Sequence, residues 1–212
     1  MRKASAKDTL ENLMYWLNKY QLTLDAVLGC PAESFDKEQK AELVEALVMK
    51  LCTIWSVSAE DLLIDCLNRN SERYAEFMNA PRLAKHIPRL QCEFMLTGIG
   101  YFDVKSVSDM KKKAQDILTE QNNPFKAIAN VDKMKIDELF TIRNYITHYS
   151  RQAERKLSNI YKKTHNMKKF EQPGYFLSAL GGRPRKPRLH AYIEAIRSAC
   201  KSMATSLAIQ LE

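Results

Sequence analysis

Hydrophobic residues recur at intervals of three and four along most of the chain, which is the spacing that places them on one face of a helix. The spacing is clear from Asp8 to Tyr20, from about Glu38 to Arg69 and from about Leu189 to Leu211. Ser106 begins a Ser-x-x-Asp pattern that indicates a helix start, and this helix is expected to end near Glu120. The sequence therefore predicts an all-α fold.

The strongest periodicity lies between about Lys135 and Lys163, a stretch that contains neither glycine nor proline. A continuous helix is predicted there, with an apolar stripe formed by Leu139, Ile142, Ile146, Tyr149, Ala153, Leu157 and Ile160. The region from Glu38 to Arg69 is apolar on several faces, which predicts a buried central element. Whether it forms one bent helix, or two helices with a new start at Ser58, stays open.

Two segments interrupt the helical pattern. Residues 79–105 contain two prolines and two glycines and are expected to form a loop-rich connector with short helical pieces. Residues 170–188 are expected to form a basic loop, which ends in the run Gly-Gly-Arg-Pro-Arg-Lys-Pro-Arg at 181–188. A length of 212 residues without internal repeats favours one domain that covers 1–212.

The cysteines and the hydropathy of the chain exclude several classes of protein. The five cysteines are widely spaced and form no Cys-x-x-Cys pair, so neither a disulfide framework nor a structural zinc site is expected. No metal or other cofactor is predicted. No signal peptide and no uncharged apolar stretch long enough to span a membrane is present, and a cytoplasmic location without membrane contact is therefore expected.

The positive charge is concentrated in one part of the chain. The net charge is +8, yet the segment from Arg143 to Arg188 contains twelve lysines or arginines and only two glutamates. This segment carries a net charge of +10, and the remainder of the chain is close to −2. Such a distribution favours a polyanion, and RNA in particular, as the partner.

Polar residues gather on one face of the predicted 135–163 helix. Asn144, His148, Arg151 and Arg155 follow one another at spacings of four, three and four, and Arg143 and Thr147 lie beside them. Histidine can give or take a proton near neutral pH, and arginine binds phosphate with a planar fork of donors. The pattern predicts a site that cuts or grips RNA, although a simple solvated helix face produces the same pattern and stays an alternative.

The six residues from Arg143 to His148 resemble the Arg-x(4–6)-His signature of the HEPN superfamily, with Asn144 in its usual polar position. A weaker similarity extends to Leu43–Leu67, which resembles the early long helix of the RiboL-PSP branch of this superfamily. Glu60 or Asp61 in this region would correspond to an acidic residue that some members of the family place near the cleft. The resemblance implies a helical bundle with long antiparallel helices.

The family resemblance also implies an activity. Many HEPN proteins are metal-independent endoribonucleases of defence, toxin–antitoxin or RNA-processing systems, and they form homodimers in which two motifs make one cleft. If the roles of the family's motif residues apply to this sequence, Arg143 and His148 would be catalytic and Asn144 would orient or bind phosphate. The remaining substrate-binding residues would be Thr147, Arg151, Arg155, Arg183, Arg185 and Lys186. The alternative is a non-catalytic module of the same fold that binds nucleic acid or a partner protein.

One position departs from the toxins of this family that are paired with a nucleotidyltransferase antitoxin. Those toxins often carry a modifiable tyrosine two residues after the histidine, and this sequence has Ser150 there. The presence of an antitoxin or defence-system partner therefore stays an open expectation.

Overall fold

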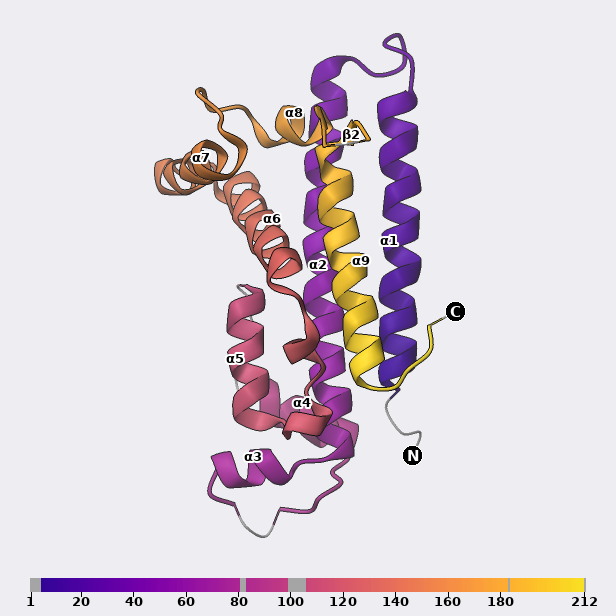
Figure 1. Cartoon of the computed structure of the whole chain (residues 1–212), viewed down its shortest axis with the longest axis vertical. Coiled ribbons are helices and arrows are strands. Elements are labelled where there is room, and N and C mark those ends of the chain that lie inside the picture. Colours follow the sequence, from indigo (N-terminus) through magenta and orange to yellow (C-terminus); the bar gives the residue numbers. More distant parts are fainter. Residues whose placement is uncertain (1–4, 81–82, 99–105, 183, 212) are drawn as a thin grey trace.

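The computed structural model describes residues 5–80, 83–98, 106–182 and 184–211, and almost all of its regular structure is helical (Figure 1). Three long helices lie side by side: α1 (Ala6–Gly29), α2 (Lys37–Arg69) and α9 (Arg188–Ser206). The predicted all-α fold is confirmed. Over the described ranges, no helix combines the length and the apolar character needed to cross a membrane.

Side-chain contacts at the two ends of α1 fix its direction against its neighbours. Near the start of α1, the Thr9 hydroxyl donates to Asp65, which lies close to the end of α2, and the Cys200 thiol of α9 contacts the Leu10 carbonyl oxygen. Near the end of α1, Asp25 lies 2.8 Å from Nε2 of His190 at the start of α9. The helix α1 is therefore antiparallel to both α2 and α9.

The central element is a single helix. Helix α2 begins at a capping box in which the side chains of Asp36 and Gln39 each bond the backbone N–H of the other. It continues without interruption through Ser58, which is buried inside the helix rather than exposed at a new start. The question that the sequence left open is thus settled in favour of one helix of 33 residues.

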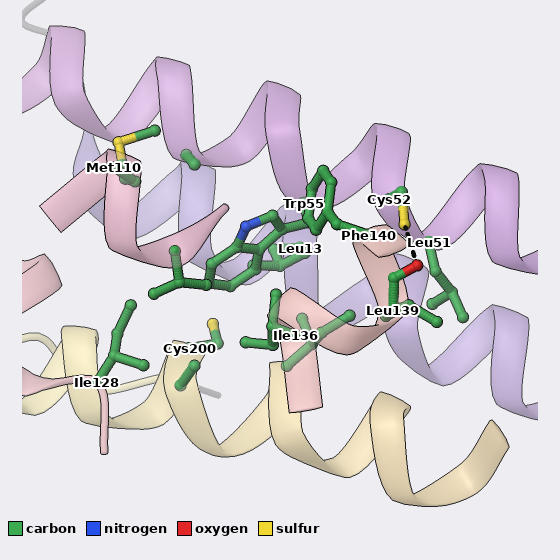
Figure 2. Packing of buried hydrophobic residues seen from close by; sticks show 14 of the residues in the cluster. Leu13, Leu51, Cys52, Trp55, Met110, Ile128, Ile136, Leu139, Phe140 and Cys200 are labelled. Carbon is green, nitrogen blue, oxygen red and sulfur yellow. Dashed lines mark hydrogen bonds between the residues drawn. The ribbon is translucent and has the colours of Figure 1, made fainter. Parts of the chain in front are cut away.

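The core forms among α1, α2, α9 and α6 (Asn130–His148), where α2 packs against α1 and α6 and α9 packs against the same two helices. The indole of Trp55 lies in the middle of this cluster, among Leu13, Ile136 and Cys200 (Figure 2). Cys52 points from α2 toward α6 and its thiol contacts the carbonyl oxygen of Leu139 at 3.9 Å. These contacts place one face of α6 firmly against the bundle.

The helix predicted over 135–163 is divided in two, so the prediction of a continuous helix was wrong. Helix α6 ends at His148, and α7 (Arg151–His165) begins directly afterwards. Tyr149 has a left-handed backbone conformation, and the Ser150 hydroxyl accepts a hydrogen bond from the Ala153 N–H. Tyr149 is 62% exposed and does not belong to the core stripe. A local cap therefore replaces helix continuation at this point.

Shorter elements close the lower end of the bundle as drawn in Figure 1. They are α3 (Glu72–Phe77), α4 (Arg89–Thr97), α5 (Val107–Ile117) and the 3-10 turns η1 (Glu120–Asn122) and η2 (Pro124–Ala127). The guanidinium of Arg89 binds the buried carboxylate of Asp65 and the carboxylate of Asp61, which ties α4 to α2. The described part of the 79–105 connector contains the short helices that the sequence predicted, whereas 81–82 and 99–105 lie outside the described residues.

The predicted basic loop contains regular structure. Helix α8 (Pro173–Ser178) packs on α2, and a short antiparallel hairpin pairs β1 (Leu180–Gly181) with β2 (Lys186–Pro187). Gly174 lies so close to α2 that an added Cβ would stand 2.3 Å from the Ala41 carbonyl oxygen. Only a residue without a side chain allows α8 to approach α2 this closely.

Substituting Gly174 tests this close approach. Gly174→Ala forces α8 away from α2, and we expect it to lower the free energy of unfolding by about 1–3 kcal/mol, as overpacking does elsewhere. Urea denaturation followed by circular dichroism measures the change. Gly29→Ala is the matched control, because a Cβ at Gly29 meets nothing within 4 Å. Equal stability of the two variants would contradict the close approach.

Candidate functional site

The candidate site centres on the junction between α6 and α7, here called the elbow and formed by residues 148–151. His148 is the last residue of α6 and Arg151 is the first residue of α7, and both are exposed. Among the described residues, the His148 imidazole makes no hydrogen bond and no ion pair. The structure therefore presents an unengaged imidazole immediately before the start of a helix.

A contact to α2 holds the elbow in place. The Tyr149 hydroxyl donates to Glu45 Oε2 at 3.1 Å, and the other oxygen of Glu45 accepts the Gly174 N–H at 2.9 Å. The ring of Tyr149 also packs edge-on against Tyr145. Partial burial and the charge of Glu45 raise the pKa of Tyr149, so the phenol stays protonated and continues to donate. Glu45 thus joins the elbow, α8 and α2.

Arg143 and His148 project from different sides of α6. Five residues of helix separate them, which corresponds to about 140° around the axis and about 7.5 Å along it. The hydroxyl of Thr147, one turn after Arg143, lies 3.6 Å from the Met49 sulfur of α2. Burial raises the pKa of the Cys52 thiol, also on α2, to about 12, and the positive charge of the nearby Arg143 opposes this rise. The half-exposed Arg143 therefore lies on the side of α6 that faces α2, whereas His148 lies away from it.

The predicted polar sector is split by the elbow. Asn144 lies one turn before His148 on α6 and is half-exposed, so these two residues share a face as predicted. Arg151 and Arg155 belong to α7 instead, because the helix ends at His148. Arg151 follows His148 by three residues across the elbow, whereas Arg155 lies one turn further along α7.

The basic residues of the hairpin lie far from the elbow. Arg185 and Lys186 are exposed, and Lys186 lies near His165, at the far end of α7. Fourteen residues of helix separate His165 from Arg151, which corresponds to about 21 Å. Arg183, which the sequence also suggested as a substrate contact, lies outside the described residues. The elbow and the hairpin are thus two separate basic regions of the surface.

Helix α7 presents a positively charged surface. Its five lysines and arginines are all exposed, and none has a carboxylate partner among the described residues: Arg151, Arg155, Lys156, Lys162 and Lys163. The first N–H groups of any helix lack intrahelical partners and attract anions. The start of α7 therefore carries backbone donors next to Arg151, with His148 three residues earlier in the chain and Glu154 in the same first turn.

Glu60 and Asp61 do not contribute to the elbow. Asp61 lies twelve residues beyond Met49 along α2, a distance of about 18 Å, and it is paired with Arg89. Among the described residues, no group of three or more histidines, cysteines, aspartates and glutamates has an arrangement that could hold a metal ion.

Comparison with known proteins yields no relative. No family model, no curated protein and no solved structure matches the chain.

The contact between Glu45 and the elbow can be tested with a double-mutant cycle. Tyr149→Phe removes one hydrogen bond and should lower the free energy of unfolding by about 0.5–1 kcal/mol, and Glu45→Ala should lower it further because it also leaves the Gly174 N–H unpaired. The double variant should be no less stable than Glu45→Ala alone. Chemical denaturation measures all three, and strictly additive effects would argue against this hydrogen bond.

Proposed function

We propose that this chain is an endoribonuclease of the HEPN type that cuts RNA by attack of the 2′-hydroxyl at the elbow. The observation that carries the proposal is the placement of an exposed, unengaged His148 directly before the start of a basic helix. The resemblance of Arg143–His148 to the HEPN signature adds to this observation. The proposal includes a role for this ribonuclease in a defence, toxin–antitoxin or RNA-processing system.

The proposed reaction uses groups of known chemistry. A base removes the proton of the RNA 2′-hydroxyl, the 2′-oxygen forms a bond to the adjacent phosphorus, and the bond from phosphorus to the 5′-oxygen breaks. An acid gives a proton to the departing 5′-oxygen. The products are a 2′,3′-cyclic phosphate and a 5′-hydroxyl. His148 supplies the proton transfer, and the donors of Arg143 and Arg151 stabilise the charge that builds on the phosphate.

The proposal includes a homodimer. One chain supplies a single histidine at the elbow, whereas the reaction needs a base and an acid. Arg143 and His148 also project from different sides of α6. A symmetric pair of chains would provide two copies of His148 and could place Arg143 of one chain beside His148 of the other. The basic surface of α7 would then bind the phosphates that flank the cut.

The alternative proposal is a module that binds RNA without cutting it. The exposed lysines and arginines of α7 support binding on their own, because phosphate binding needs no catalytic group. The two proposals agree on the partner and differ in the consequence of removing His148. In the alternative, His148 contributes at most one contact to affinity.

A cleavage assay with a matched histidine control separates these proposals. We expect the purified chain to cut single-stranded RNA in the presence of a chelator and to leave cyclic phosphate ends. His148→Ala should lower the rate by about a hundredfold or more, which is the usual contribution of a general acid–base group. His86→Ala, which changes another exposed histidine that lies on the connector, should leave the rate unchanged. Wild-type cleavage by His148→Ala would disprove the catalytic role.

The salt dependence of RNA binding tests the surface of α7. Arg151→Glu combined with Arg155→Glu should weaken binding and reduce the slope of log affinity against log salt by about 0.7 for each phosphate that the variant no longer neutralises. Fluorescence anisotropy with a labelled single-stranded RNA measures both quantities. Lys112→Glu changes an exposed lysine of α5, which lies beyond the end of α6 that is opposite to α7 (Figure 1), and should have little effect. Because Lys112→Glu changes the net charge by half as much as the double variant, a decrease in log affinity half as large would show that net charge alone determines binding.

A further inference from the structure

Tyr149 has a backbone conformation that tyrosine rarely adopts. Its φ of 45° and ψ of 29° lie in the left-handed region, where glycine and asparagine are favoured and bulky side chains are strained. At the end of α7 the same conformation is adopted by Asn166, with φ of 52° and ψ of 35°. Two consecutive helices therefore end in the same way, but only α6 ends on an aromatic residue. Strain of this kind calls for an explanation in the side chain.

The contacts of Tyr149 within the protein use only part of its side chain. The hydroxyl donates to Oε2 of Glu45 at 3.1 Å, and the ring centroid lies 5.4 Å from that of Tyr145, with 60° between the ring planes. These contacts fix the orientation of the ring. Tyr149 is nevertheless 62% exposed, so burial of apolar surface does not explain why a ring stands at this position.

A series of aromatic contacts supports the Tyr149 ring from within the protein. Tyr145 is buried, its ring centroid lies 5.4 Å from that of Phe170, and its hydroxyl donates to Gln172 at 3.1 Å. The Phe170 ring in turn stacks on the buried ring of Tyr161, with 5.8 Å between the centroids. The residue against which Tyr149 packs is therefore itself held in place. A ring ordered in advance binds a ligand at little cost in conformational entropy.

Tyr149 lies on the same side of α6 as Arg143. Contacts with three successive turns of α2 show this arrangement, and the pairs are Tyr149 with Glu45, Thr147 with Met49, and Arg143 with Cys52. A separation of six helical residues corresponds to about 9 Å along the axis. An exposed aromatic ring and a half-exposed guanidinium thus stand on one side of the predicted motif.

Carboxylates distinguish the surroundings of Tyr149 from the basic surface of α7. Partial burial raises the pKa of Tyr149, and the charges of Glu45 and Glu42 raise it further, so both carboxylates lie near the ring. Negative charges repel a phosphate group, which is attracted instead by the arginines and lysines of α7. The part of an RNA strand that suits the Tyr149 ring is therefore the uncharged base.

From these features we propose that Tyr149 is a stacking platform for one base of the RNA strand that binds at the elbow. Aromatic side chains stack bases of single strands, and this contact tolerates any sequence because every base has a flat face. The inference rests on the proposed function in that RNA must bind at the elbow, but it does not require cleavage there. It also specifies the class of substrate. The bases of a duplex are stacked on one another, so the RNA at the elbow is unpaired.

Fluorescence anisotropy of the full chain tests the platform. The ligand is a labelled single-stranded RNA that carries 2′-O-methyl groups and therefore cannot be cut by 2′-hydroxyl attack. Tyr149→Asn removes the ring but retains a residue that tolerates the left-handed backbone, and it should weaken binding by about tenfold. Tyr149→Phe keeps the ring and should bind within about twofold of the wild type. Tyr15→Asn is the matched control on α1, because it removes another exposed tyrosine and should leave the affinity unchanged.

A strand of the same length and charge without bases completes the test, and wild type and Tyr149→Asn should bind it equally well. The platform is overturned if Tyr149→Asn binds the complete RNA as the wild type does. It is also overturned if Tyr149→Phe loses as much affinity as Tyr149→Asn, because the Glu45 contact would then be responsible. Neither result affects the proposed function. Failure of the wild type to bind RNA overturns both proposals, whereas ring-dependent binding without cleavage of unmodified RNA overturns catalysis alone.

Discussion

The burial of α2 is the constraint on which the rest of the molecule depends. Apolar side chains along this helix contact α1 on one side and α6 and α8 on others, with Trp55 at the centre. Burial of apolar surface is the main favourable contribution to folding, and here most of it involves one element. The same helix carries Glu45 near its start and Asp65 near its end, so its polar contacts fix both the elbow and the lower helices.

The long helices could be predicted from the sequence because their signals are local. Helix α2 was expected from about Glu38 to Arg69 and occupies Lys37–Arg69, since periodic apolar residues and terminal caps lie within the segment itself. The break at Tyr149 could not be predicted in the same way. The periodicity of apolar residues continues across it, and the Glu45 contact that holds Tyr149 comes from 104 residues earlier in the chain.

The candidate site was predictable as a set of residues but not as an arrangement. The motif Arg143–His148 can be read from six consecutive residues, whereas the direction of Arg151 and Arg155 depends on where α6 ends. The buried cluster around Glu138 had no signal in the sequence. Glu138, His165 and Tyr192 lie on three helices, and the spacing between them along the chain matches no known pattern. Only the packing of α6, α7 and α9 brings them together.

Helix α7 is held to the molecule along one narrow side. It buries only Ala153, Leu157 and Tyr161, and the rest of its surface is solvated and charged. Segments with few buried apolar contacts open at a lower free-energy cost than the core does, and their amide hydrogens exchange faster. The molecule therefore has a stable bundle and a weakly held basic arm. Because His165 of this arm also contacts the buried Glu138 of α6, a local opening of α7 would uncover Glu138 without unfolding the bundle.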